Sequence, residues 1–162
     1  MKIILILVLV CLCSYVGFGF GKYYKKRKVF FQEFVLLLES LNLDISFSRE
    51  KIHVILTQKN FKSSSLNKLI ENYVNLLQKE GFDEKELFEN VKILKEDEMN
   101  LIYNFFKMLG RFNVDLQTKQ IQEHKQKILI VSKQCDEEEK KYSPLFLKLG
   151  IMFGALLGLI FV

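Results

Sequence analysis

The chain has 162 residues, of which 49% are hydrophobic, and a formal net charge of +5. Its length allows one domain of about 120 residues beside two apolar segments and excludes a large multi-lobed enzyme. The positive charge does not indicate a nucleic-acid-binding domain, because residues 29–142 hold 17 basic against 19 acidic residues, a net of −2.

The first predicted element is an apolar helix at residues 3–20, which contain no charged residue. At about 1.5 Å per residue it extends roughly 27 Å, close to the ~30 Å hydrocarbon layer of a membrane. A cleaved export signal is the alternative, because Lys2 precedes the run. The run is longer than the usual signal core, and no small-residue cleavage site follows it at the expected distance. We therefore expect a retained transmembrane helix at residues 1–21.

Five basic residues follow this segment directly. Positive charge beside an apolar span marks its cytoplasmic side, so the N-terminus is expected on the opposite face of the membrane. The residues that carry this topology signal are Lys22, Lys25, Lys26, Arg27 and Lys28.

Residues 22–142 are expected to form a cytosolic all-α domain, because they show no strand alternation and no long Gly/Ser linker. Apolar residues recur at three- and four-residue spacing, which is typical of helices with one buried face. Ser48, Asp83 and Asp115 are predicted to begin helices, and Gly81 and Gly110 to end them. The six predicted helices cover residues 22–46, 48–58, 63–81, 83–94, 96–109 and 115–142, forming an antiparallel bundle.

A second transmembrane helix is predicted at residues 143–162, in which Lys148 is the one charged residue and can reach the headgroups. The positive-inside bias then places both termini on the face opposite the middle domain. Gly150, Gly154 and Gly158 share one helix face. This stripe is typical of close helix packing, here against Gly17 and Gly21, or of ordinary membrane-helix composition.

No catalytic, cofactor-binding or metal site is predicted. The chain lacks the phosphate-binding P-loop, GxSxG, HExxH and CxxC patterns. Cys11 and Cys13 lie inside the apolar run, and His53 and His124 are interpreted as surface or interface residues of helices. No disulfide framework is expected.

Two acidic clusters and three aromatic residues are the remaining candidates for function. Residues 96–98 begin a predicted helix, where negative charge favours the helix dipole. The second cluster is a solvated face, a contact for a basic partner or, least of all, a divalent-metal site. Its residues are Asp136, Glu137, Glu138 and Glu139. Phe61, Phe82 and Phe112, in or beside predicted loops, are candidate partner contacts.

The order of these features resembles the stage III sporulation protein AB family. The resemblance rests on GFGKYYKKR at residues 19–27, LNLDISF at 41–47, EMNLIYNFFKMLGRFN at 98–113, a Gln-rich last helix and the C-terminal apolar run. The chain departs from the family pattern at residues 41–45, where one of two acids is kept, and at residues 50–52. Pro144 before the last span is also unusual.

The resemblance implies a non-enzymatic component of the channel-like complex that links mother cell and forespore. It implies anchoring in the outer forespore membrane, with the middle domain on the mother-cell side. The domain would be similar to the F-type platform domain of type II secretion systems and would contact the stage III sporulation ATPase. Other membrane components, or further copies of the chain, are the other expected partners. The alternatives are a small-molecule-sensing membrane protein or a small membrane enzyme unrelated to sporulation.

Overall fold

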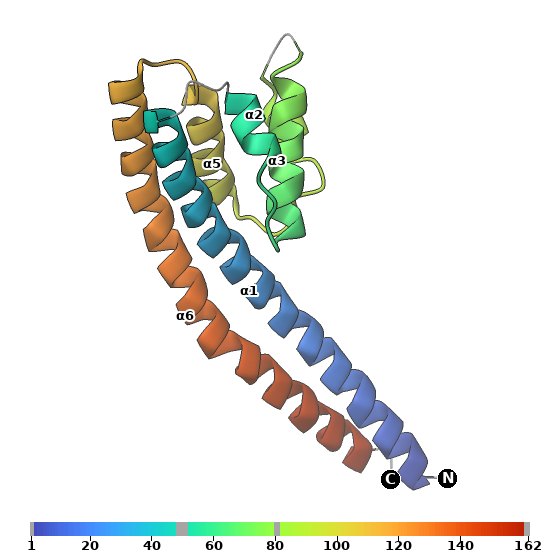
Figure 1. Ribbon diagram of the computed structural model, residues 1–162. Coiled ribbons are helices and arrows are strands. Elements are labelled where there is room, and N and C mark those ends of the chain that lie inside the picture. Colours follow the sequence, from blue (N-terminus) through green and yellow to red (C-terminus); the bar gives the residue numbers. More distant parts are fainter. Residues whose placement is uncertain (1, 48–51, 80–81, 161–162) are drawn as a thin grey trace. The chain divides into compact units, whose positions relative to one another are not determined.

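The structure, a computed structural model, describes residues 2–47, 52–79 and 82–160 (Figure 1). Within these ranges the chain forms six helices and no strand, which confirms the predicted all-α class. The helices are α1 (Lys2–Phe47), α2 (Ile52–Thr57), α3 (Ser64–Leu76), α4 (Glu84–Leu87), α5 (Glu96–Met108) and α6 (Val114–Ile160).

The chain divides into two compact units. The first, here called the two-helix unit, comprises Met1–Lys28 and Lys133–Val162, and the second, the bundle unit, comprises Val29–Ser132. The helices α1 and α6 each extend through both units: residues 2–28 of α1 and 133–160 of α6 belong to the two-helix unit, and the rest of each helix belongs to the bundle unit. The predicted boundaries at residues 21/22 and 142/143 refer to a membrane surface and stay a prediction.

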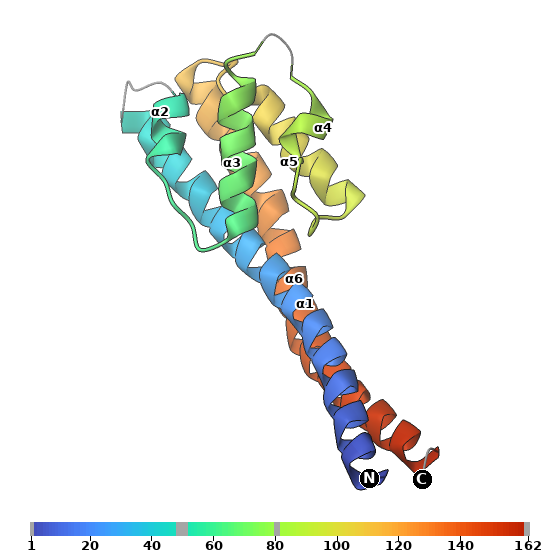
Figure 2. The ribbon, with the colours of Figure 1, turned by 90° about the vertical axis from the view of Figure 1, so that its right-hand side faces the viewer.

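The core of the bundle unit forms around one face of α1. Aromatic and aliphatic residues at positions 30, 31, 34, 37, 38 and 41 follow helical spacing, and all are fully buried. The ring of Phe34 lies edge-on to Phe105 and Phe106 of α5. Tyr73 of α3 completes this cluster, with its ring centroid 4.5 Å from that of Phe106. The helices α2 and α4 lie against α3 (Figure 2).

The fourth helix is much shorter than predicted. Only residues 84–87 are helical, after an N-cap in which Asp83 accepts from the backbone N–H of Lys85. Asn90 adopts a left-handed backbone conformation with φ of 62°, which a right-handed helix cannot include. Leu87 and Val91 are nevertheless buried. Their apolar spacing therefore reports burial and not a continuous helix.

Several predicted helix ends also differ. The third helix ends at Leu76, before Gly81, which lies outside the described residues, as does Ser48. The last helix begins at Val114, and Asn113 caps it in place of Asp115 by accepting from the backbone N–H of Leu116. Gly110 does adopt the left-handed conformation expected of a helix terminator, with φ of +81°.

Both long helices continue through the positions at which spans were predicted to begin or end. Pro144, which lacks a backbone N–H, is accommodated inside α6. Over the part of the chain that the structure describes, none of the helices combines the length and the apolar character needed to cross a membrane.

Candidate functional site

Glycines allow α1 and α6 to pack closely in the two-helix unit. A Cβ added at Gly150 would lie 2.6 Å from the carbonyl oxygen of Cys13, and one at Gly17 would lie 2.5 Å from that of Phe146. These neighbours are backbone atoms, which cannot move aside as a flexible side chain can. A Cβ at Gly154 would lie 2.7 Å from Cα of Val10, and one at Gly21 would lie 2.9 Å from Oγ of Ser143.

These contacts show that the two helices are antiparallel, because residues later in α1 lie against residues earlier in α6: Val10 lies against Gly154, and Gly21 against Ser143. Glycines that sequence analysis assigned to one stripe thus lie at the seam. Gly158 is buried. Gly19, by contrast, has no atom within 4 Å of an added Cβ and faces away from α6.

The outer faces of the same two helices carry large apolar side chains. Exposed patches of this extent on a soluble protein mark a protein or membrane contact. The exposed residues are Val8, Leu12, Tyr15, Val16, Phe18 and Phe20 on α1, and Leu145, Leu147, Leu149, Ile151, Met152, Phe153 and Leu156 on α6.

Ion pairs join α1 to α6 at the other end of the two-helix unit. Arg27 is only 2% exposed, and its Nη1 lies 2.5 Å from Oε2 of Glu138. The Lys28 Nζ atom lies 2.7 Å from Oδ1 of Asp136 and 3.4 Å from Oε2 of Glu139. Asp136 also pairs with Lys140 one turn further along α6, at 2.5 Å.

The acidic cluster is therefore engaged within the chain by basic residues of α1, a pairing that sequence analysis did not predict. Glu137 is exposed. A contact of these four residues with a basic partner stays a prediction. Of the five basic residues that follow the first apolar segment, Arg27 and Lys28 are paired in this way. Lys22, Lys25 and Lys26 are exposed, as is Lys148.

The pairing shifts the pKa of both partners in opposite directions. Hydrogen bonds from Lys140 and then Lys28 hold the pKa of Asp136 below its usual 3.8. The hydrogen bond to Asp136 holds the pKa of Lys28 above its usual 10.5. A lowered carboxyl pKa stabilises the fold above pH 3.8, and a raised lysine pKa stabilises it below pH 10.5. The pair therefore contributes between about pH 4 and pH 10.

An Asp136→Asn chain should unfold at a lower temperature than the wild type near pH 7. The difference should disappear as the pH falls below 3.8 and through the lowered pKa, because the wild-type carboxyl is then protonated as well. Thermal unfolding followed by circular dichroism from pH 2 to pH 8 measures this. A difference that is the same at pH 2 and pH 7 would contradict the ion-pair explanation.

The three candidate phenylalanines have different surroundings. Phe82 packs against Tyr103 and Tyr73, with ring centroids 5.3 Å and 5.9 Å away. Phe61 is half-buried, and its backbone N–H donates to Oδ1 of Asn67. Phe112 is 42% exposed and stays the most accessible candidate for a partner contact.

Of the two positions that the sequence allowed for His124, the helix surface or an interface, the structure shows the interface. Its side chain is 6% exposed, its Nδ1 lies 3.1 Å from the carbonyl oxygen of Gln120, and its ring centroid is 5.7 Å from that of Phe105. His53 is exposed, as predicted. The acidic run at residues 96–98 does begin a helix, where Glu98 accepts from the backbone N–H of Lys95.

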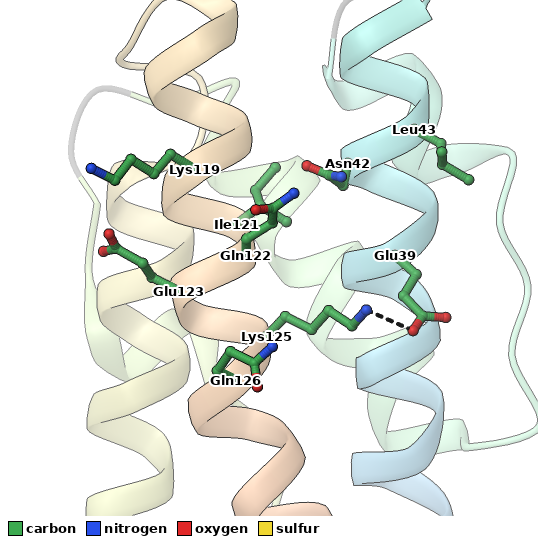
Figure 3. Close-up of a pocket in the computed structure, with 9 residues that line it drawn as sticks. All are labelled: Glu39, Asn42, Leu43, Lys119, Ile121, Gln122, Glu123, Lys125 and Gln126. Atoms are coloured by element: carbon green, nitrogen blue, oxygen red, sulfur yellow. Dashed lines mark ion pairs between the residues drawn. The ribbon is translucent and has the colours of Figure 1, made fainter.

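A groove of about 630 Å³ runs between α1 and α6 in the bundle unit (Figure 3). Figure 3 shows Asn42 and Gln122 between the two helices, while the Nζ of Lys125 reaches Oε1 of Glu39 at 2.8 Å. The Oδ1 atom of Asn42 is buried and accepts no hydrogen bond from the described residues. Leu43 is exposed on one side of the groove. The groove is thus lined by amides, by charges of both signs and by one exposed leucine.

Among the described residues, no group of three or more His, Cys, Asp or Glu side chains is placed to hold a metal ion. The described residues thus define an all-α protein with a small helical bundle and a glycine-packed antiparallel helix pair. A sequence profile described as stage III sporulation protein AB matches residues 2–162, so the chain belongs to that family, as the resemblance indicated. Searches of curated proteins and of solved structures find no match.

Proposed function

We propose that this chain is a non-enzymatic, membrane-anchored assembly component of the complex that links mother cell and forespore. Membership of the stage III sporulation protein AB family supports the role in sporulation. In this proposal the two-helix unit is the anchor, and the bundle unit docks a secretion-type ATPase in the mother-cell cytosol.

The exposed apolar surface of the two-helix unit is the observation that supports its role as a membrane anchor. Glycines face the seam between α1 and α6, so the large apolar side chains of both helices are left on the outside. A helix pair that buries small residues and exposes large apolar ones is typical of packing in lipid. The apolar sequence runs at residues 3–20 and 145–162 agree with this assignment.

The proposed topology follows from the charges that flank these runs. Basic residues lie where each run meets the rest of the chain, and Lys148 is the one charge beyond them at the C-terminal end. The positive-inside bias then places the bundle unit in the cytosol and both termini across the outer forespore membrane.

Docking of an ATPase by the bundle unit is supported by the composition of its exposed surface. The groove between α1 and α6 offers amides and both signs of charge, and Phe112 provides an exposed aromatic ring in the loop after α5. Exposed aromatic residues are frequent anchors of protein interfaces. The identity of the ATPase, the stage III sporulation ATPase, comes from the family resemblance alone.

The full-length chain, reconstituted in lipid nanodiscs, should bind the purified stage III sporulation ATPase in a titration. Phe112→Ala should weaken binding by roughly tenfold if this ring is an interface anchor, while leaving the unfolding temperature within a few degrees of wild type. Phe82→Ala is the matched comparison, because its ring packs internally against Tyr73 and Tyr103. It should lower the unfolding temperature.

Absence of association between the folded wild-type chain and the folded ATPase would overturn the docking proposal. Unchanged affinity of the Phe112→Ala chain would remove Phe112 from the interface but leave docking elsewhere on the bundle unit. Association of the chain with the membrane is tested separately, by flotation with vesicles after the detergent is removed.

A further inference from the structure

Four exposed lysines lie at one level of the two-helix unit, because antiparallel packing brings their positions together. The contacts of Gly17 with Phe146 and of Gly21 with Ser143 set the register of the two helices at this level. Tyr24 and Tyr142 stack there, with ring centroids 5.4 Å apart. The residues concerned, here called the lysine belt, are Lys22, Lys25, Lys26 and Lys141.

The ammonium groups of the lysine belt are available to a ligand. All four residues are exposed, and within the described residues none of them makes an ion pair, in contrast to Lys28 and Lys140, which are held by Asp136. Lys22 lies over the ring of Phe18 and Lys141 over the ring of Tyr142, at 4.6 Å and 5.3 Å from the centroids.

The neighbours of the lysine belt differ on its two sides. Toward the chain termini the large exposed side chains at residues 8–20 and 145–156 are apolar, with Lys148 as the one charged residue among them. Away from the termini lie the acidic residues 136–139, of which three pair with basic residues of the same unit. Lysines without an ion pair, next to tyrosines and at the limit of an apolar surface, are the arrangement found at a membrane–water boundary.

We propose that the lysine belt binds the phosphate groups of anionic phospholipids in the membrane that holds the two-helix unit. This inference rests on the proposed membrane anchor and adds a lipid preference to it. Nucleic acid also offers phosphates, but it would not cover the adjoining apolar side chains, whereas a lipid presents a phosphate and an acyl chain together. Each lysine near an anionic surface strengthens binding by about fivefold at low salt.

The test measures which lipids surround the full-length chain. The chain has no tryptophan, so tyrosine fluorescence is observable, and Tyr23, Tyr24 and Tyr142 lie in or beside the lysine belt. Quenching by brominated phosphatidylglycerol is compared with quenching by brominated phosphatidylcholine in vesicles of phosphatidylcholine. We expect a preference for phosphatidylglycerol of at least fivefold at low salt, reduced severalfold at 0.5 M salt by screening.

Three variants, each with four substitutions, locate the preference. The chain with Lys22, Lys25, Lys26 and Lys141 all replaced by Gln should lose it, and the same four positions replaced by Arg should keep it. The control replaces four exposed lysines of the bundle unit by Gln and should also keep it. Its positions are Lys68, Lys92, Lys119 and Lys127.

Equal quenching by both lipids in the wild-type chain would overturn the inference, as would a preference that survives the Gln substitutions in the lysine belt. If those substitutions prevent folding, the salt dependence and the Arg variant decide. Failure of the proposed anchor is distinguishable, because the wild-type chain would then not float with vesicles of either composition.

Discussion

Replacement of Phe106 by alanine is expected to lower the free energy of unfolding of the bundle unit by about 3–5 kcal/mol. The ring is 1% exposed and contacts Phe34, Tyr73 and Phe105, so its removal leaves a cavity among three other rings. Backbones of three helices fix these rings in place, and they cannot collapse fully into the space. A loss of this size is a large part of the stability of a small domain.

The measurement is urea unfolding of the full-length chain followed by the helical signal in circular dichroism. Phe112→Ala is the control, because it removes a ring of the same size from an exposed position, and it should change the free energy of unfolding by no more than about 0.5 kcal/mol. If Phe106→Ala lowers the free energy of unfolding by less than about 1 kcal/mol, the aromatic cluster does not stabilise the core as proposed.

Isoleucine at both Gly150 and Gly154 is expected to separate α1 from α6 in the two-helix unit. The first Cβ alone would overlap the backbone of Cys13, and the second the backbone of Val10, so the helices would have to move apart by more than a side-chain adjustment. Close backbone approach is what small residues at such a seam permit. Most contacts of the unit would weaken together.

Crosslinking reports this separation. In a chain with its three native cysteines replaced, Tyr24→Cys and Tyr142→Cys place two thiols where the wild-type rings stack. The yield with a short bifunctional reagent should fall severalfold when isoleucine is present at positions 150 and 154. Gly19→Ile is the matched control and should leave the yield unchanged, because nothing lies near an added Cβ there. Equal yields in both variants would contradict close packing at the seam.

The helical fold could largely be predicted from the sequence, because apolar spacing follows burial directly. The stripe from Phe30 to Leu41 is buried as expected, and the acidic start of α5 was recognised. The same rule gave a wrong prediction for residues 88–94, where Val91 is buried although it lies outside any helix. The helix ends at Leu87, and the left-handed conformation of Asn90 prevents it from continuing. The spacing of apolar residues carries no information about such a conformation.

The pairing of Arg27 and Lys28 with the acidic cluster was missed for a different reason. Each run was interpreted alone, the basic one as a topology signal and the acidic one as a surface. Two antiparallel helices with glycine stripes have a definite register, and that register brings position 27 opposite position 138. The signal was therefore present in the sequence, but only as a relation between segments more than 100 residues apart.

The common register of the glycine seam and the ion pairs limits how related chains can change in length. Inserting one residue in α1 between Val10 and Lys28 would rotate the rest of that helix by about 100°. Glycines beyond that point would then leave the seam, and Arg27 would turn away from Glu138. Insertions are better tolerated in the described loops between the helices, so variation in chain length among relatives should be concentrated at segments such as residues 58–63, 88–95 and 109–113.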